Sequence, residues 1–474
     1  MSKIICVIFI CVSAAYSQTF QEFIKRINSS PEIQKKRLVE DFLSKHSQLP
    51  VIEQDTLCHF IYKGNAKSVS IAGDLTGWNP DIAILSNIKG SDFWYKTFTF
   101  SADTRLDYKL VLNRRDWILD PGNPNQSLSG YGTNSELRMP KYKPPKEIEY
   151  YPEIAHGSMW DTTFYSEELK NERPVKVYLP ANYASTTDSF ALVLFHDGLD
   201  YLNLANAKNV LDYFIAQNHI EPVIGLFVPA VNRNDEYIKK QKESFSKFLV
   251  RKVIAEIDRK FRTKINPKKR AVVGISAGGN IALWMGLHYS NVFENIAAHS
   301  SYIESGLFAG FQNASKTELK LFIDLGKYDI PMLIPLVQSF VPLIRAKGFE
   351  YKYFELNDSH NWANWRRHLD DALQFFFPGK AMANITAEKS DKELVRFEPH
   401  IKFSVSDTSQ VEINIYNLKG KLIQTLFNTK IPGSEYAVAW DGFDFRNKKQ
   451  PCGLYFCSIK IENKLSEMRR IVNF

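Results

Sequence analysis

The sequence has little cysteine and no long apolar run. Its 474 residues include five cysteines, and two of them, Cys6 and Cys11, fall within the first twenty positions. The other three are too few and too scattered for a disulfide framework or for the C-x-x-C spacing of a zinc site. No stretch approaches the ~18 apolar residues that a transmembrane helix needs. We therefore expect no disulfide scaffold, no metal site and no membrane span.

The sequence also lacks a concentrated charge of one sign. Sixty Lys and Arg residues stand against 52 Asp and Glu, a formal net charge of +8, but the basic residues are mostly interleaved with acidic ones. We interpret them as solvated surface and expect no nucleic-acid partner. At about 100–200 residues per domain, a chain of this length predicts two to four domains.

The N-terminus carries a short apolar segment. Lys3 precedes an apolar run over residues 4–12, and small residues suited to cleavage follow near Ser17. This order is typical of a secretory signal peptide, which would comprise residues 1–17. We therefore expect an exported protein, secreted or held at the cell surface.

After this segment the hydrophobic pattern changes twice. Residues 18–50 have apolar side chains at spacings of three and four, which predicts a short helical segment interrupted at Pro31. Residues 51–140 form short alternating runs divided by Gly, Asn, Asp and Pro, the pattern of a small all-β sandwich. Residues 141–152 are rich in Pro and Lys and are expected to form an extended linker.

The second half of the chain contains two further regions. Residues 153–380 alternate apolar strands with helical patterns, which predicts an α/β domain whose mostly parallel sheet is covered by helices on both faces. A second linker is expected at 381–395. Residues 396–474 return to alternating β runs and predict a second all-β sandwich. The expected fold class is therefore multidomain, an α/β domain between two β-sandwich modules.

The first β region resembles a known module. The stretches "VSIAGDLTGWNP" (69–80) and "DYKLVLNRRDWILDPGNP" (107–124) resemble the early-set β-sandwich modules that precede glycogen-branching enzymes and many secreted esterases. In some relatives this module binds glucans through exposed aromatic side chains, for which the candidates here are Trp78, Trp94 and Trp117. The alternative, which we favour, is that these tryptophans are core or interface residues.

The last β region resembles another module. The stretch "WDGFDFRNKKQPCGLYF" (440–456) is similar to the immunoglobulin-like C-terminal modules of flagellar hook-capping proteins and type IX sorting domains. The resemblance implies a role in export or surface attachment, with the export machinery as a partner. The alternative is a stabilising appendage without a sorting role.

The strongest chemical signal lies in "RAVVGISAGGNIALWMGL" (270–287). A strand pattern is followed by G-x-S-x-G, formed by Gly274, Ser276 and Gly278, and then by a helix pattern. This arrangement predicts a nucleophile elbow, in which a serine occupies a strained turn between strand and helix. The N–H of Ala277 would then be one oxyanion donor. The alternative is an ordinary serine that caps the helix.

A nucleophilic serine needs a base and an acid, which follow it in chain order in this fold class. His360 lies in the polar loop "NDSHNW" after a strand, and His299 is the second candidate base. Asp329 lies in the loop after "LFIDLG" and is the candidate acid. Asp324 is better explained as a structural strand-end carboxylate. Asp358 lies too near the base in sequence for a comfortable triad but is not excluded.

Further candidates surround this set. In "LVLFHDGLDY" (192–201), Gly198 permits a turn after an early strand and the N–H of Leu199 is the candidate second oxyanion donor. Trp362 and Trp365 follow His360 at the start of a helix. They are expected either to wall an aromatic acyl pocket or to pack their own helix.

At this point a family resemblance is evident. The motifs "RPVKVYLPANY", "LVLFHDG", "RNDEY", "GISAGGNIAL", "GKYD" and "SHNWANWRRHL" occur in the order of the putative-esterase family of α/β-hydrolases, over roughly residues 153–379. That family includes feruloyl and acetyl xylan esterases, enterochelin esterases, esterase D and mycolyltransferases. The resemblance implies a triad of Ser276, Asp329 and His360, oxyanion donors at Leu199 and Ala277, and a contact of Asp197 with substrate hydroxyls. The loop "NDSHNW" departs from the family pattern because it lacks the usual glycine pair.

These observations predict a secreted serine esterase that needs no metal or organic cofactor. A β-sandwich ahead of the hydrolase and a surface-type C-terminus favour feruloyl or acetyl esters of plant cell-wall polysaccharide. Hydrolysis of a siderophore trilactone is the enzymatic alternative, and transfer of the acyl group to a sugar hydroxyl also stays open. A hypothesis of another class is a non-catalytic surface glycan-binding protein.

Overall fold

The computed structural model describes residues 18–314, 318–380 and 400–473, the last range with gaps at 419, 432–433, 441–443, 446–447, 449, 452 and 463. The chain forms two compact units, Met1–Asn384 and Ile385–Phe474. The expected signal peptide (1–17) and second linker (381–395) lie outside the described residues. Both therefore stay predictions.

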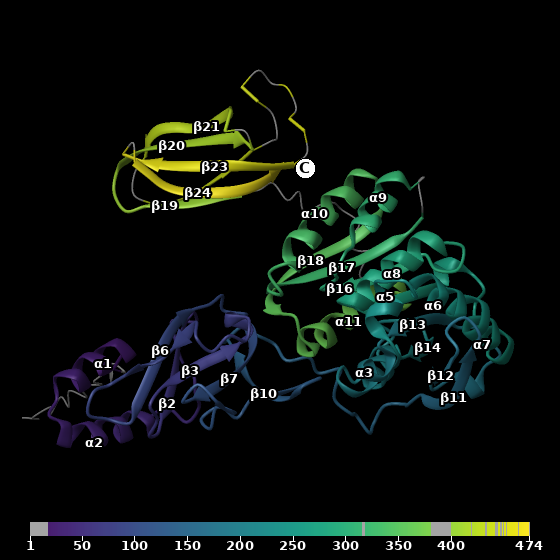
Figure 1. Cartoon of the computed structure of the whole chain (residues 1–474), viewed down its shortest axis with the longest axis horizontal. Helices are drawn as coiled ribbons and strands as arrows, with labels where there is room; N and C mark the ends of the chain where they lie inside the picture. The colour runs from purple at the N-terminus through teal and green to yellow at the C-terminus, as the bar shows by residue number, and fades with distance from the viewer. Residues whose placement is uncertain are drawn as a thin grey trace, which may run out of the picture. The chain divides into compact units, whose positions relative to one another are not determined.

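Two helices and a β-sandwich begin the first unit (Figure 1). A capping box between Thr19 and Glu22 starts the first helix, and Pro31 separates it from the second. The sandwich consists of a four-stranded and a six-stranded antiparallel sheet around a core that includes Phe60 and Tyr108. The elements are α1 (Phe20–Ser29), α2 (Glu32–Leu43), β1 (Val51–Glu53), β2 (Leu57–Lys63), β3 (Val69–Gly73), β4 (Ala83–Ile84), β5 (Ser86–Asn87), β6 (Phe93–Thr99), β7 (Arg105–Leu112), β8 (Asp116–Ile118), β9 (Gln126–Ser129) and β10 (Gly132–Arg138).

An eight-stranded sheet organises the rest of the first unit. Its order is β11-β12-β14-β13-β15-β16-β17-β18, with antiparallel pairing from β11 to β14 and parallel pairing from β14 to β18. The strands are β11 (Ser158–Ser166), β12 (Asn171–Leu179), β13 (Ala191–His196), β14 (Val223–Val228), β15 (Arg270–Ile275), β16 (Asn295–His299), β17 (Lys320–Tyr328) and β18 (Glu350–Ser359). The parallel strands end at one edge of the sheet, where open α/β folds bind their ligands.

Helices cover both faces of this sheet (Figure 1). One apolar core includes Phe245, Ile281 and Val337, and the core on the other face includes Leu211 and Leu369. The helices are α3 (Gly198–Asn203), α4 (Ala207–Ala216), α5 (Arg233–Tyr237), α6 (Lys242–Phe248), α7 (Ala255–Lys260), α8 (Ala277–His288), α9 (Ser305–Asn313), α10 (Leu333–Ala346) and α11 (Trp362–Phe376), and a π-helical turn (Leu249–Ile254) joins α6 to α7. The predicted α/β fold is confirmed.

The second unit is all β where it is described. One pair of antiparallel strands, β19 (His400–Val405) and β22 (Ser434–Ala439), accompanies a four-stranded antiparallel sheet. That sheet consists of β21 (Leu422–Ile431), β20 (Ser409–Asn417), β23 (Gly453–Ile461) and β24 (Lys464–Asn473). Its core includes Ile413, Trp440 and the free, buried Cys457.

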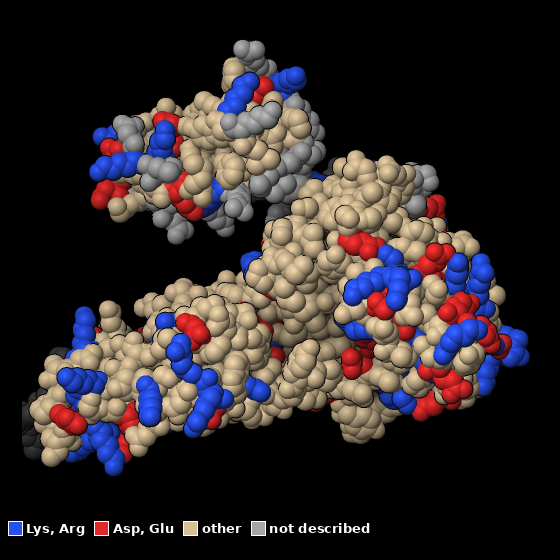
Figure 2. All heavy atoms as spheres, viewed as in Figure 1, with Lys and Arg blue, Asp and Glu red and all other residues tan. Residues whose placement is uncertain are grey.

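The surface of the described residues is of mixed charge. On the face shown in Figure 2, blue and red side chains alternate over the α/β part. Many are paired, as in the contacts of Lys264 and Lys269 with Glu221. None of the helices in the described ranges is long and apolar enough to cross a membrane.

Candidate active site

Ser276 occupies a strained turn between β15 and α8. Its φ of 52° and ψ of −118° are unfavourable for a residue that carries a Cβ. The turn is tight because a Cβ added to Gly274 would lie 2.1 Å from the carbonyl oxygen of Gly278. The Ser276 side chain makes no capping hydrogen bond to α8, as a helix-capping serine would. The geometry is that of a nucleophile elbow.

His360 and Asp329 form a hydrogen-bonded pair at the same edge of the sheet. Asp329 follows β17 and His360 follows β18, and these strands are parallel neighbours. His360 Nδ1 lies 2.8 Å from Asp329 Oδ1, which also accepts the N–H of Ile330 at 2.7 Å. The carboxylate is fully buried, whereas the imidazole is 16% exposed. The hydrogen bond to Asp329 fixes the His360 imidazole through Nδ1, so Nε2 is available to exchange a proton with another group.

The second candidate base, His299, lies beneath the elbow. It ends β16, is fully buried, and pairs through Nδ1 with Asp324 Oδ2 at 2.5 Å. Its carbonyl oxygen accepts the N–H of Ser276 at 2.9 Å. His299 and Asp324 therefore support the turn from within the core, which fits the structural interpretation of Asp324.

Two other titratable residues also have structural partners. Asp358 is buried and lies 3.6 Å from the guanidinium of Arg105, so its charge partner is an arginine rather than His360. From the sequence alone His368 is expected on a helix surface, but the residue is only 7% exposed, so that expectation is wrong. Its Nδ1 lies 2.8 Å from Asp371 Oδ2, one helical turn away.

A second tight turn, at Asp197 and Gly198, adjoins the elbow. Asp197 has a φ of 53°, and a Cβ on Gly198 would lie 2.3 Å from the backbone nitrogen of Val228. A Cβ on Gly278 would lie 3.1 Å from Asp197 Oδ2, so the two turns lie side by side. The candidate oxyanion donors, the N–H groups of Leu199 and Ala277, lie in the first turns of α3 and α8, where no helical acceptor is available to them.

Asp197 is paired with an arginine that sequence reasoning did not single out. Arg233 Nε and Nη2 donate to the two carboxylate oxygens at 2.9 and 2.7 Å, and Nη2 also donates to the carbonyl of Ile275 at 3.2 Å. The N–H of Asp197 donates to Tyr237 Oη at 2.9 Å. The motif "RNDEY" contains both Arg233 and Tyr237 and was the available signal for this contact.

Trp362 and Trp365 are largely buried at the start of α11. Their rings lie 5.2 Å apart at 85°, within the core on one face of the sheet. Trp365 also packs edge-to-face against the imidazole of His360, with ring centroids 4.9 Å apart. This contact restrains the rotation of the His360 imidazole. Most of the surface of Trp362 and Trp365 packs in the core beside α11, as the helix-packing interpretation expects.

The tryptophans of the sandwich differ in exposure. Trp94 is 9% exposed and belongs to the core, as we favoured. Trp78 and Trp117 are 36% and 44% exposed, so they are not core residues and the core interpretation is wrong for these two. The indole N–H of Trp78 donates to Asp74 Oδ1 at 3.2 Å.

A buried cluster of charges connects the sandwich to the loop of His360. We call it the Arg105 cluster, and it consists of Asp74, Arg105, Asp107, Glu136, Asp358 and Asn361. Arg105 is fully buried and binds Glu136 and Asp107. Burial, together with the charge of Asp107, raises the pKa of Asp74 to about 7. Burial also raises the pKa of Asp358 to about 6.

These raised pKa values predict that stability falls as pH rises. Between about pH 4 and pH 7 the folded protein binds protons at Asp74 and Asp358 that the unfolded chain has already released. The free energy of unfolding should therefore decrease across this window and level off above it. Urea unfolding from pH 5 to pH 8 measures the slope, which should be shallower for Asp74→Asn than for the wild type. Asp81→Asn, which alters an exposed carboxylate, is the control, and an unchanged slope in Asp74→Asn would contradict the assignment.

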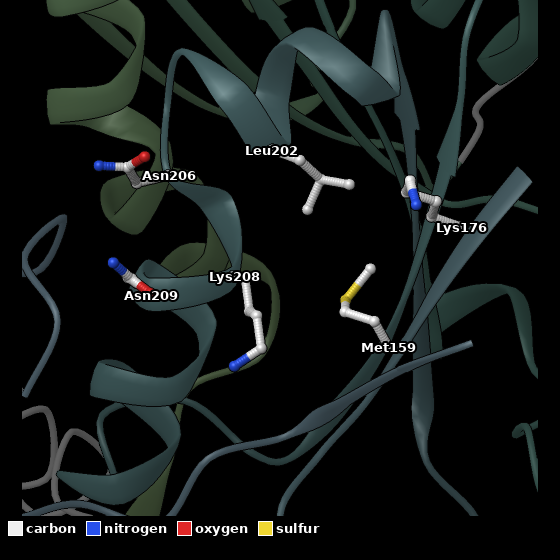
Figure 3. Close-up of a pocket in the computed structure, with 6 residues that line it drawn as sticks. All are labelled: Met159, Lys176, Leu202, Asn206, Lys208 and Asn209. Atoms are coloured by element: carbon white, nitrogen blue, oxygen red, sulfur yellow. The ribbon is translucent and has the colours of Figure 1, made fainter. Parts of the chain in front are cut away.

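A cavity of about 330 Å³ lies between β11, β12, α3 and α4. Met159 and Leu202 point toward each other across it (Figure 3). Its two lysines, Lys176 and Lys208, are paired with Asp161 and Asp212 at 2.6 Å. None of its lining residues belongs to the candidate site, so we assign it no role in the chemistry.

Within the described residues, no group of three or more His, Cys, Asp or Glu side chains is arranged to hold a metal ion. The polar side chains of the candidate site instead form the pairs of His360 with Asp329 and of Arg233 with Asp197.

Comparison with known proteins finds similar esterases. Residues 166–376 match the family model described as "Putative esterase". Uncharacterized protein YjcH of Bacillus subtilis (strain 168) is 23% identical over 234 residues, which are 46% of this chain and 97% of that protein. The endo-1,4-beta-xylanase/feruloyl esterase of Xylanibacter ruminicola is 24% identical over 251 residues, 49% of this chain and 34% of that protein. The chain thus spans about a third of that larger relative.

Solved structures share the fold over a wider range. The enterobactin esterase FES of Shigella flexneri, in the presence of enterobactin, aligns with a TM-score of 0.60 at 20% identity, over 71% of this chain and 97% of that one. The ferric enterobactin esterase of Salmonella typhimurium aligns with a TM-score of 0.61 at 16% identity, over 71% and 98%. The shared fold therefore extends beyond residues 166–376. Over residues 166–376 the α/β part of this chain is thus similar to the putative esterase family, and the chain is a carboxylic ester hydrolase.

Proposed function

We propose that this protein is a secreted serine esterase in which Ser276, His360 and Asp329 form the catalytic triad. The observation that carries the proposal is the pairing of His360 Nδ1 with the buried Asp329 carboxylate, 2.8 Å apart, at the sheet edge where Ser276 occupies its strained turn. Export rests on the signal-like residues 1–17 of the sequence.

The chemistry proceeds in two steps. His360 Nε2 takes the proton of Ser276 Oγ while that oxygen attacks the ester carbonyl carbon, and the same proton then goes to the leaving alcohol. Water attacks the acyl-enzyme with His360 as base, the carboxylic acid departs, and Ser276 regains its proton. The negative charge on the carbonyl oxygen of each tetrahedral intermediate is stabilised by the N–H groups of Leu199 and Ala277. Asp329 stabilises the imidazolium that forms in both steps.

For the substrate we propose a feruloyl or acetyl ester of plant cell-wall polysaccharide. Support comes from the relative named as a xylanase/feruloyl esterase and from the pairing of charges beside the elbow. Arg233 is the cation next to Ile275 and Ser276, and Asp197 neutralises it with two hydrogen bonds. A neutral ester fits such surroundings better than an anionic one, because the pair offers little net positive charge.

The second candidate substrate is a siderophore trilactone. The observation in its favour is the fold shared with the two enterobactin esterases, which covers 71% of this chain and therefore more than the α/β part. An anionic catecholate complex would need a positive pocket. On this hypothesis Arg233 would have to exchange Asp197 for the ligand.

Covalent labelling and a substrate panel test the proposal together. A fluorophosphonate should label the wild-type protein once, on the peptide that contains Ser276, and peptide mass spectrometry locates the adduct. Methyl ferulate, p-nitrophenyl acetate and a catecholate trilactone should then rank by kcat/KM with the trilactone lowest. A label on another residue would overturn the triad, whereas a preference for the trilactone would overturn the substrate alone.

A further inference from the structure

The N-terminal sandwich contacts the loops that carry both His360 and Asp329. Tyr328, which precedes Asp329, packs against the sandwich core, and its ring lies 6.1 Å from that of Phe100 in an edge-to-face arrangement. The carbonyl of Tyr328 accepts the hydroxyl of Ser359 at 2.7 Å, which connects the two loops directly. A single surface of the sandwich therefore supports the acid and the base.

Asn361, the residue after His360, forms hydrogen bonds through both its amide oxygen and its amide nitrogen. Its Oδ1 accepts the N–H of Asn364, which caps α11, at 3.0 Å, and accepts Arg105 Nη1 at 2.9 Å. Its Nδ2 donates to Asp74 Oδ2 at 2.8 Å. Because the N–H of Asn364 requires an oxygen as its partner, the side-chain amide of Asn361 has one orientation. The other two partners of this amide, Arg105 and Asp74, belong to the sandwich.

Those partners are themselves held firmly. Arg105 has no solvent exposure, and its other nitrogens bind Glu136 Oε1 at 2.6 Å and Asp107 Oδ1. Asp74 accepts the N–H of Asp107 at 2.7 Å. A buried arginine with carboxylates on several sides has little rotational freedom. The position of β7 therefore determines where Arg105 holds the side-chain amide of Asn361.

We propose that Arg105 and Asp74 are positioning residues that act through Asn361 to hold His360 in register with Ser276. The inference rests on the proposed triad and assigns the sandwich a part in catalysis that is distinct from glycan binding. Misplacement of a reacting group by about 1 Å can cost a factor of about 10² in rate. Loss of the bonds to Asn361 should therefore reduce kcat more than it changes KM.

The test separates positioning from helix capping and from general stability. Asn361→Ser keeps a capping oxygen for Asn364 but removes the amide that reaches Arg105 and Asp74. Arg105→Met removes the other side of the same contact, and Arg105→Lys restores one donor. We expect kcat for methyl ferulate, normalised to the folded fraction measured by circular dichroism, to fall about 10- to 100-fold in the first two variants. The lysine variant should recover part of the loss, and KM should change less than threefold.

Two comparisons decide the outcome. The variant Asp103→Ala removes another contact between the sandwich and β18, the exposed 2.7 Å hydrogen bond from Asn357 Nδ2 to Asp103 Oδ1. This bond does not involve Asn361, so the variant should leave kcat unchanged. The double variant Asn361→Ser/Arg105→Met should lose less than the product of the single losses, because both break one contact. Activity that falls only in proportion to the folded fraction, or losses that multiply, would overturn the positioning role. Full activity of Ser276→Ala would instead overturn the triad itself.

Discussion

Replacement of Ser276 by alanine is expected to lower kcat for ester hydrolysis by a factor of about 10⁴–10⁶. The substitution removes Oγ and keeps the Cβ, so the strained turn and its hydrogen bond to His299 should persist. Without the nucleophile no acyl-enzyme forms, and only the oxyanion donors and substrate binding are left to assist water. Steady-state kinetics with p-nitrophenyl acetate and methyl ferulate measure the loss, and thermal unfolding verifies the fold.

Ser300→Ala is the matched control for this prediction. Ser300 is buried and, like Ser276, has a positive φ, here 43°, and its hydroxyl has no hydrogen-bond partner among the described residues. This variant should retain activity within about a factor of two, because the hydroxyl it removes makes no contact to lose. If Ser276→Ala and wild type were equally active, or equally inert, the triad would lose its support. Glycan binding, through Trp78 or Trp117, would then be the function to examine.

The second large effect is expected for Asp329→Asn. Exchange of the carboxylate for an amide removes the negative charge that stabilises the imidazolium and places an N–H group where His360 Nδ1 needs an acceptor. By analogy with serine-protease triads, kcat should fall by about 10³–10⁴. The apparent affinity for substrate should change little, since the Asp329 side chain is fully buried. Pre-steady-state kinetics should show slower formation and slower hydrolysis of the acyl-enzyme.

A matched histidine–aspartate pair provides the control. His368 Nδ1 lies 2.8 Å from Asp371 Oδ2, the same separation as in the pair of His360 with Asp329, but both residues lie on α11. Asp371→Asn should therefore leave kcat within a factor of about two, as is usual for a partly exposed ion pair. Equal losses in both variants would mean that the aspartate acts through stability and would contradict the role of Asp329.

The local part of the site could be predicted from sequence. The elbow needs only a strand, G-x-S-x-G and a helix in succession, so residues 270–287 contain the whole signal. The α/β class followed from the alternation of apolar strands with helices, which the sheet from β13 to β18 confirms. The roles of His360 and Asp329 came from chain order and loop position, and both residues lie at the strand ends where that reasoning expected them.

Contacts between distant segments could not be predicted in this way. The bond of Asp197 to Arg233 depends on how a turn and a distant helix approach each other, and the motif "RNDEY" marks Arg233 without indicating its partner. Arg105 lies in a strand whose alternation gives no sign that a charge is buried there. The burial of His368 could not be predicted because nine of the fifteen residues of α11 are buried, and the apolar periodicity alone does not say how wide the buried face of a helix is.

The Arg105 cluster also bears on the order in which the protein acquires activity. Arg105 and Asn361 are 256 positions apart, and Asp74 and Asn361 are 287 apart. At a synthesis rate of about 5–20 residues per second, the partner of Arg105 emerges roughly 10–50 s after Arg105 itself. Such long-range contacts form late in folding, because closing a long loop costs conformational entropy before the contact contributes any stabilising free energy. A newly made chain would therefore be unable to cleave esters until its last parallel strand has joined the sheet, which delays hydrolysis until folding is nearly complete.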